Sequence, residues 1–382
     1  MGRIAIFCDG TWNSPTIAQP THVVSLFDHT AITAEQRTVY ITGVGTRARN
    51  AGFLAGLADR IGGGAFGWGL NDNIKQAYHS LCLLYRPGDD IMIFGFSRGA
   101  YTARSLAGMI RKCGILKSPT PENVDAAFDL YRLAGPENHP DALQIIKARR
   151  ALSPHYATSQ DDVNHRLVNP IDDDPDEHRI VRISYLGIWD TVGALGIPAP
   201  ILGPIAGLWN GKYRFHDTKL SRIVSAARHA VALDERRVFY RPSLWDNLEA
   251  SRDDPGRNAG DRSENRKFKQ VWFTGTHAIV GGSDAARGLA GESLAWIAEG
   301  AQQAGLEMRA GNMLDAPLDP LVNSLSLSQP PWLYQVAGHL LKWRDGPGHD
   351  IDLHASAKAR VEGRRDYRPR SLQNLMPHLF DA

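Results

Sequence analysis

Apolar runs of strand length recur along the chain and alternate with stretches in which apolar residues follow a helical period. The clearest helical stretch is 71–85, where Ile74, Tyr78 and Leu81 fall on one face. Alternation of this kind predicts an α/β fold, with a mainly parallel sheet covered by helices on both faces. The runs expected to be strands are 3–8, 38–42, 91–94, 180–189 and 270–274.

The third of these runs leads into Gly95-Phe96-Ser97-Arg98-Gly99, and a helix of small residues is expected after it, over 100–110. A serine between two glycines at a strand-to-helix turn is typical of a nucleophile elbow, because a side chain at either glycine would collide with the adjoining elements. The pattern predicts Ser97 as a nucleophile and the amide of Arg98 as an oxyanion donor. The alternative is a purely structural turn.

A serine nucleophile needs a histidine to take its proton and an acid to orient that histidine, in the chain order serine, acid, histidine for this type of sheet. Asp190 ends the run at 180–189, and His277 follows the run at 270–274 beside a pair of glycines. Both are expected at the carboxyl edge of the sheet. A turn cap is the alternative role for Asp190. The rival base is His229, which lies in a helical pattern over 225–237, where a packing role is commoner.

A second oxyanion donor is expected from the loop after the first strand, where Gly10 permits close backbone approach and Gly10 or Thr11 supplies an amide. The segment Asp9-Gly10-Thr11 also resembles the nucleophile loop of aspartyl-phosphate phosphatases. Those enzymes have a further aspartate at the position of Phe7, so this alternative is disfavoured.

The length of 382 residues allows one large domain with insertions or two domains, and we favour one hydrolase domain over 1–310. The polar stretch at about 115–179 is too long for a simple loop, so a helical lid or insertion is expected there, with helices over 122–134 and 141–152. Residues 311–382 are expected to be an extension that packs on the core and faces a membrane or a partner.

An apolar loop rich in proline and glycine spans about 193–215, and we interpret it with equal weight as a wall for an acyl chain or as core covering. The apolar segment 331–343 has aromatic ends that suit a lipid interface. The basic tail after it is expected to be solvated, with a patch that binds anionic lipid as the alternative. The glycine-rich stretch at 62–69 is interpreted as a turn in preference to a phosphate-binding loop. The three aspartates at 172–174 are interpreted as a solvated acidic loop in preference to a cation site. The side chains expected to bind substrate are Leu195, Ile197, Ile201, Leu202 and Trp209.

The formal charge is only +2, from 43 basic and 41 acidic residues, so no global field recruits nucleic acid. Three cysteines without metal-type spacing are expected to be buried thiols. No metal or cofactor is implied. The start of the chain does not resemble a signal peptide, so we expect cytoplasmic synthesis, and any export would proceed without a conventional leader.

Several motifs occur together in a fixed order, and they resemble those of the DUF2235 family. Members are similar to the catalytic domain of the first class of type VI secretion lipase effectors, which are phospholipases with an α/β-hydrolase core. The motifs are Asp9-Gly10-Thr11-Trp12-Asn13, Gly43-Val44-Gly45-Thr46, Gly95-Phe96-Ser97-Arg98-Gly99-Ala100, Leu186 to Gly193, His229-Ala230, Leu233 to Arg237, and His277 with Val280-Gly281-Gly282.

The resemblance extends to about residue 305 and implies that Ser97 is the nucleophile, Asp190 the acid and His277 the base. The family usually has an acid two residues after this histidine, whereas this chain has Ile279. The function expected is a serine hydrolase that cleaves lipid acyl esters through an acyl-enzyme, as a phospholipase A does. The alternatives are a soluble carboxylesterase or thioesterase and a non-catalytic interaction protein. The expected partners are a lipid substrate, a membrane surface, and an immunity or secretion-system protein.

Overall fold

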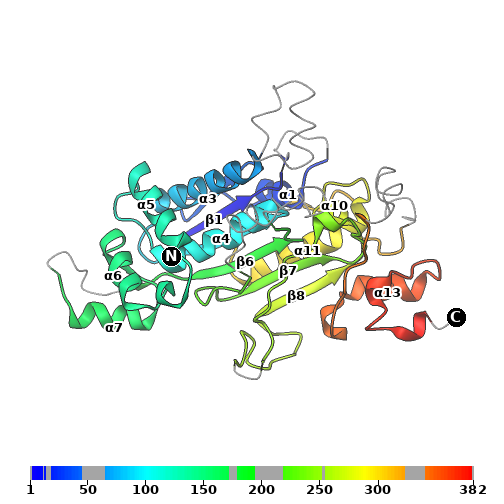
Figure 1. The fold of residues 1–382 in the computed structure, drawn as a ribbon. Coiled ribbons are helices and arrows are strands. Elements are labelled where there is room, and N and C mark those ends of the chain that lie inside the picture. The colour runs from blue at the N-terminus through cyan, green and yellow to red at the C-terminus, as the bar shows by residue number, and fades with distance from the viewer. Residues whose placement is uncertain are drawn as a thin grey trace.

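A six-stranded parallel sheet forms the centre of the molecule in the computed structural model (Figure 1). The structure describes residues 2–11, 13, 19–44, 65–171, 179–193, 218–251, 254–322 and 340–380. The strand order is β2-β1-β3-β6-β7-β8, and every neighbouring pair is parallel. The strands are β1 Arg3–Cys8, β2 Gln36–Ile41, β3 Asp90–Phe96, β6 Ile183–Trp189, β7 Ala227–Ala232 and β8 Phe268–Phe273.

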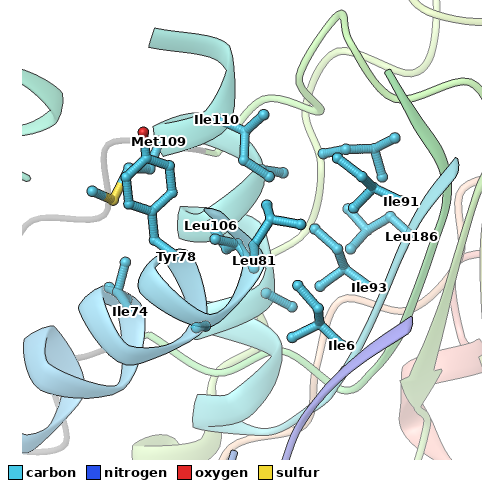
Figure 2. Close-up of a cluster of buried hydrophobic side chains, with 14 of the residues drawn as sticks. Ile6, Ile74, Tyr78, Leu81, Ile91, Ile93, Leu106, Met109, Ile110 and Leu186 are labelled. Atoms are coloured by element: carbon cyan, nitrogen blue, oxygen red, sulfur yellow. The ribbon is translucent and has the colours of Figure 1, made fainter. Parts of the chain in front are cut away.

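Each face of the sheet is covered by helices, and successive residues of a strand point to opposite faces. Ile4 and Ile6 of β1 face one buried cluster, whereas Ala5 and Phe7 face the other. The first cluster includes side chains of α3 Ala65–Leu84 and α4 Arg98–Cys113 (Figure 2). The second includes α1 His22–His29 and α11 Arg287–Gln303. The α/β architecture is therefore as predicted.

The five predicted strands are all present, but β7 lies where the sequence pattern predicts a helix, and that prediction is wrong. Its sequence, Ala-Arg-His-Ala-Val-Ala, reads as helical because alanine is the strongest helix former. Every residue of β7 is buried, and β6 and β8 pair with it on either side. Backbone pairing and tight packing beneath α11 override the local propensity.

The inserted segment after α4 folds into α5 Pro121–Arg132, α6 Leu143–Leu152 and α7 Gln160–Val168, with a short parallel pair of β4 Tyr156–Ala157 and β5 Arg179–Ile180. Two of its backbone carbonyls accept hydrogen bonds from the last turn of α4: Lys112 Nζ donates to Leu133 O at 2.6 Å, and Cys113 Sγ to Ala127 O at 3.1 Å.

These helices lie at the end of α4 opposite Ser97. Ser97 is the N-cap of α4, and the 16 residues of the helix rise about 24 Å along its axis. Figure 1 shows α5, α6 and α7 grouped at one end of the molecule, away from α10 His277–Val280. The described part of the insertion is therefore placed differently from the expected lid, since it does not cover the nucleophile.

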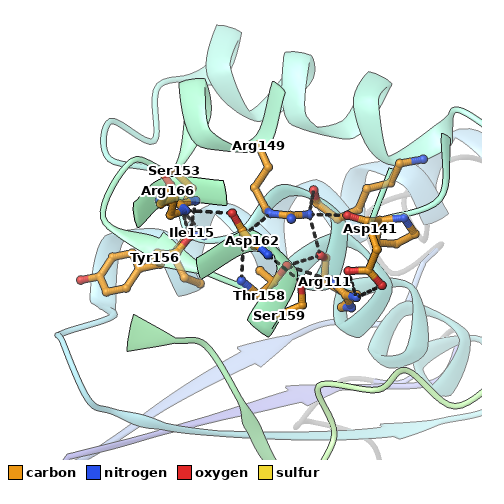
Figure 3. A network of polar contacts seen from close by, with 12 residues as sticks. Arg111, Ile115, Asp141, Arg149, Ser153, Tyr156, Thr158, Ser159, Asp162 and Arg166 are labelled. Atoms are coloured by element: carbon orange, nitrogen blue, oxygen red, sulfur yellow. Dashed lines mark hydrogen bonds and ion pairs between the residues drawn. The ribbon is translucent and has the colours of Figure 1, made fainter. Parts of the chain in front are cut away.

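A buried charge network fixes the insertion in place (Figure 3). Asp162 accepts hydrogen bonds from Arg149 Nε at 2.7 Å and Arg166 Nε at 2.8 Å, and the three side chains are fully buried. Arg149 also donates to the backbone O of Lys112 at 3.3 Å, which satisfies a carbonyl in the last turn of α4. Arg166 donates to the backbone O of Tyr156 at 2.9 Å. The network thus joins α4, α6, α7 and β4.

Replacing Asp162 with asparagine is expected to destabilise the protein by roughly 3–5 kcal/mol, because it removes the charge that compensates two buried guanidinium groups. Chemical denaturation measures this loss. The matched control is Asp125→Asn, which breaks the ion pair between Lys75 and Asp125. Because the Asp125 side chain is 61% exposed, this change should lower the stability by less than about 1 kcal/mol. Equal stabilities of the two variants would contradict the assigned role of the network.

Residues 340–380 pack against β8 and the loop that follows β7. Trp272 of β8 pairs with Leu353, and α13 Ala355–Gly363 contributes Val361 to a shared buried cluster. Arg360 is only 2% exposed and its guanidinium lies 4.9 Å from the Tyr367 ring centroid. The expectation of a solvated basic tail is therefore wrong for Arg360, whereas Arg365 and Arg370 are exposed as expected.

Three further expectations have different outcomes. Cys8, Cys82 and Cys113 are buried free thiols, as predicted. Residues 65–69 of the glycine-rich stretch begin α3 instead of forming a turn. The expected acidic loop at 172–174, the whole of 194–217 and most of 331–343 fall outside the described residues. Across the described ranges, no helix is long and apolar enough to span a membrane.

Candidate active site

Ser97 sits in a strained turn between β3 and α4. Its backbone has φ 58° and ψ −122°, a conformation that costs energy for a residue with a side chain. A Cβ on Gly95 would lie 2.5 Å from Gly99 O, and a Cβ on Gly99 would lie 2.1 Å from Cys8 O. Both glycines are therefore required by backbone contacts, as the elbow motif predicts.

The turn brings Ser97 to a histidine and a carboxylate from two other strand ends. Ser97 Oγ lies 2.9 Å from His277 Nε2, and His277 Nδ1 lies 2.6 Å from Asp190 Oδ2. All three side chains are buried. The structure thus assembles the three residues in one hydrogen-bonded chain, with the histidine between the hydroxyl and the acid.

Asp190 follows β6 and is held in place by further donors. Its Oδ1 accepts from the backbone N of Ala232 at 2.9 Å, and Arg344 donates to both of its oxygens, at 2.6 and 2.9 Å. Burial alone raises the pKa of this carboxyl, but Arg344 and the hydrogen bond with His277 outweigh burial and hold the pKa well below 3.8. Asp190 is therefore ionised at neutral pH.

His277 lies between two aromatic rings at the start of α10. Its ring centroid is 4.7 Å from that of Phe96 and 4.8 Å from that of Tyr240, and its backbone N donates to Glu235 Oε2 at 3.2 Å. Burial lowers the pKa of His277 below 6.5, although Asp190 and Glu235 oppose this shift. The imidazole is neutral at pH 7, the state in which it can accept a proton.

His229, the rival base, has both ring nitrogens engaged elsewhere. Its Nε2 accepts from the backbone N of Thr191 at 3.2 Å, and its Nδ1 lies 3.0 Å from Gln270 Oε1. Burial lowers its pKa to about 3, so it is neutral. His229 lies in β7 and supports the residue after Asp190, which is a structural role.

The loop after β1 runs close to the nucleophile. A Cβ on Gly10 would lie 3.3 Å from Ser97 Cβ. The N–H of Gly10, however, donates to its neighbour Asp9 Oδ1 at 2.6 Å, and Asp9 also accepts from Thr21 at 2.9 Å and Tyr40 at 2.5 Å. The amide of Gly10 is therefore already used, and Thr11 becomes the better candidate for the second oxyanion donor.

Arg98 is the first residue of α4, where a backbone N–H has no acceptor within the helix. It directly follows Ser97, the position expected of the first oxyanion donor.

Within the described part of the chain, the hydroxyl of Thr11 is buried without a hydrogen-bond partner. A buried hydroxyl in that state costs energy that a bound polar group would recover.

A family model for the type VI secretion system phospholipase effector Tle1-like catalytic domain matches residues 2–300. The chain belongs to this family. It is also 29% identical over 253 residues to an uncharacterized protein of Saccharomyces cerevisiae. The aligned region covers 63% of this chain and 32% of the yeast protein.

Two solved structures are similar to this chain at 15% identity. One is an uncharacterized protein from Pseudomonas aeruginosa, with a TM-score of 0.42 over 83% of this chain and 48% of that one. The other is the Tle1 effector bound to the VgrG spike of the type 6 secretion system, with a TM-score of 0.34 over 74% and 52%. The chain spans about a third of the curated relative and about half of each solved chain.

One position departs from the pattern expected for this Tle1-like domain. Ile279 stands where an acid was expected, and it is fully buried in a small cluster with Ala286, Leu289 and Ala290. The apolar side chain fills space against Gly275, where an added Cβ would lie 2.5 Å from Ile279 Cγ2. Ile279 therefore packs the His277 loop. In the ranges that the structure describes, no group of three acidic, histidine or cysteine side chains could hold a metal.

The sequence-based reasoning missed one residue at the site and named others that the structure leaves undescribed. Arg344 lies beyond the part of the chain that the Tle1-like family model matches, and it carries no local motif. A basic residue in an irregular segment gives no signal of a partner 154 residues away. The expected substrate-binding residues are all outside the described ranges, namely Leu195, Ile197, Ile201, Leu202 and Trp209.

Proposed function

We propose that this chain is a serine hydrolase that cleaves acyl esters of phospholipids through a covalent acyl-serine. The observation that carries the proposal is the chain of hydrogen bonds from Ser97 through His277 to Asp190. Membership of the Tle1-like phospholipase effector family supports a lipid substrate. We propose Ser97 as the nucleophile, His277 as the base and Asp190 as the residue that orients the histidine.

In the first half of the reaction, Ser97 Oγ attacks the ester carbonyl carbon while His277 Nε2 takes the hydroxyl proton. The carbonyl oxygen gains the negative charge, and we propose that the amides of Arg98 and Thr11 stabilise it. His277 then gives its proton to the departing glycerol oxygen, which leaves as an alcohol. The products of this half are a lysophospholipid and an acyl group on Ser97.

In the second half, a water molecule attacks the acyl carbonyl and His277 takes its proton. Collapse of the intermediate releases the fatty acid and returns the proton to Ser97 Oγ. Asp190 stays ionised throughout and stabilises the imidazolium that forms in each half, since its pKa lies well below neutral pH.

The substrate class is tested with phosphatidylglycerol vesicles whose two acyl chains differ in mass. The proposal predicts one free fatty acid and the complementary lysophospholipid, identified by mass spectrometry, and no product from Ser97→Ala. Activity confined to short monomeric esters, with no release from vesicles or mixed micelles, would overturn the phospholipase assignment in favour of a soluble esterase. A secretion-system or immunity partner remains a further proposal that rests on the family alone.

The pH dependence of kcat/KM follows from the environment of His277. Protonated His277 cannot accept the serine proton, so activity is lost as pH falls through its pKa. Because burial lowers that pKa below 6.5, we expect the acid limb to have its midpoint below pH 6.5, measured with a short-chain ester. The charged groups that face His277 are Asp190, Glu235 and Arg237. A rate that is independent of pH through this limb would exclude histidine as the base.

A further inference from the structure

We propose that Arg344 is a positioning residue of the active site, which fixes the plane of the Asp190 carboxylate and offsets its charge. The inference rests on the proposed function and extends the catalytic unit beyond residue 300, where the family match ends. It assigns a role to the C-terminal segment 340–380, for which the sequence predicted only packing or an interface.

The guanidinium of Arg344 is held by four hydrogen bonds. Nη1 donates to Asp190 Oδ1 at 2.6 Å and to Ala232 O at 2.8 Å, while Nη2 donates to Asp190 Oδ2 at 2.9 Å and to Tyr240 O at 2.6 Å. The side chain is 5% exposed and that of Asp190 is fully buried. Two backbone carbonyls therefore fix the guanidinium, and its planar fork in turn fixes both carboxylate oxygens.

This geometry determines which oxygen faces the histidine. The Oδ1 atom of Asp190 accepts from Ala232 N and Arg344 Nη1, whereas Oδ2 accepts from Arg344 Nη2 and lies 2.6 Å from His277 Nδ1. Without Arg344, the carboxylate would keep only the backbone donor Ala232 N and the imidazole, so its plane would be held less firmly. A misplacement of His277 by about 1 Å relative to Ser97 is enough to slow a reaction about 100-fold.

Arg344 also changes the charge balance around the base. The charged groups facing His277 are Asp190 after β6, with Glu235 and Arg237 after β7, and the uncharged ring of Tyr240 packs beside them. Arg237 pairs with Glu235 at 2.7 Å, and Arg344 pairs with Asp190. The two carboxylates that face His277, Asp190 and Glu235, thus each have their own arginine. Removing Arg344 would leave Asp190 uncompensated and favour the protonated imidazole.

The segment that carries Arg344 is bonded to the loop after β7. Lys342 N donates to Arg236 O at 2.7 Å, and Ser371 Oγ donates to Leu233 O at 2.9 Å. Tyr367 donates to Asp234, and Asp234 Oδ2 accepts from the backbone N of Gly275, two residues before His277. These contacts make the segment part of the support for both Asp190 and the histidine loop.

The test measures the second-order rate of Ser97 labelling by a fluorophosphonate probe from pH 5 to pH 9. For Arg344→Gln we expect labelling about 100-fold slower than wild type at neutral pH, and an acid limb shifted upward by about one pH unit. Arg344→Lys keeps the charge without the fork, so it should be slower with an acid limb close to that of wild type. The matched control is Arg266→Gln. It breaks the 2.9 Å pair between the buried Arg266 and the partly exposed Asp352 of the same C-terminal segment, and it should leave rate and midpoint unchanged.

A second readout uses the Asp190→Asn background, where removing Arg344 should slow labelling less than about 3-fold further if Arg344 acts through Asp190. The proposal is overturned if Arg344→Gln labels like wild type, or if Arg344→Gln and Arg266→Gln slow labelling equally with no shift of the acid limb. Should Arg344→Gln fail to fold, wild-type rates in Arg344→Lys would overturn it. Absence of labelling in folded wild type would contradict the proposed function itself.

Discussion

Ser97→Ala is expected to lower ester turnover by about a million-fold while the protein remains folded. The hydroxyl oxygen is the atom that would form the acyl bond, and nothing else at the elbow replaces it. The side-chain change is small, and the partner of the hydroxyl is His277, which keeps its bond with Asp190. Initial rates with a short-chain ester measure the effect, and circular dichroism checks the fold.

The matched control for this prediction is Ser105→Ala. Ser105 is also buried in α4, two turns further along the helix, and the proposed mechanism gives it no role. It should retain the wild-type rate within a few-fold. A Ser97→Ala protein that keeps more than about a tenth of wild-type turnover would mean that another group attacks the ester.

Asp190→Asn is expected to lower turnover by about ten-thousand-fold, the loss known for the equivalent change in other serine triads. The neighbours of Asp190 explain why an amide cannot substitute. At the Oδ1 position, Ala232 N and Arg344 both donate, so the amide oxygen is expected there. The amide NH₂ then faces His277 Nδ1 and donates to it. That bond places the imidazole proton on Nε2, where it blocks proton transfer from Ser97.

The loss in Asp190→Asn should appear mainly in kcat, since the residue does not contact the substrate in the proposed mechanism. The control is Asp141→Asn, which removes a carboxylate paired with Arg111 at 2.6 Å in the insertion, remote from Ser97. It should leave kcat unchanged. Equal kcat in Asp190→Asn and wild type would show that Asp190 is only a turn-forming residue.

The strand pattern was predictable because β1, β3 and β6 are apolar runs buried on both faces of a parallel sheet. β7 was not, since its alanines give a helical signal and only pairing with β6 and β8 reveals the strand. The position of the insertion was equally hidden. The length of 115–179 indicates an insertion, but no local pattern tells at which end of α4 its helices pack.

The site was partly predictable for a topological reason. Ser97, Asp190 and His277 each follow a parallel strand, and the carboxyl ends of such strands meet at one edge of the sheet. Arg344 follows no strand and reaches Asp190 from an irregular segment, so only the folded chain identifies it. The hydrogen bond from Gly10 to Asp9, which favours Thr11 as a donor, likewise depends on a backbone turn that composition does not specify.

The central claim is that Ser97 is an activated nucleophile, and covalent labelling tests it most directly. Purified protein is treated with a fluorophosphonate, with and without detergent micelles, and analysed by intact mass and peptide mapping. We expect one adduct per chain, located on the peptide that contains Ser97, and none on Ser97→Ala or on acid-unfolded wild type. No adduct on folded wild type under either condition, or equal labelling of Ser97→Ala, would contradict the claim.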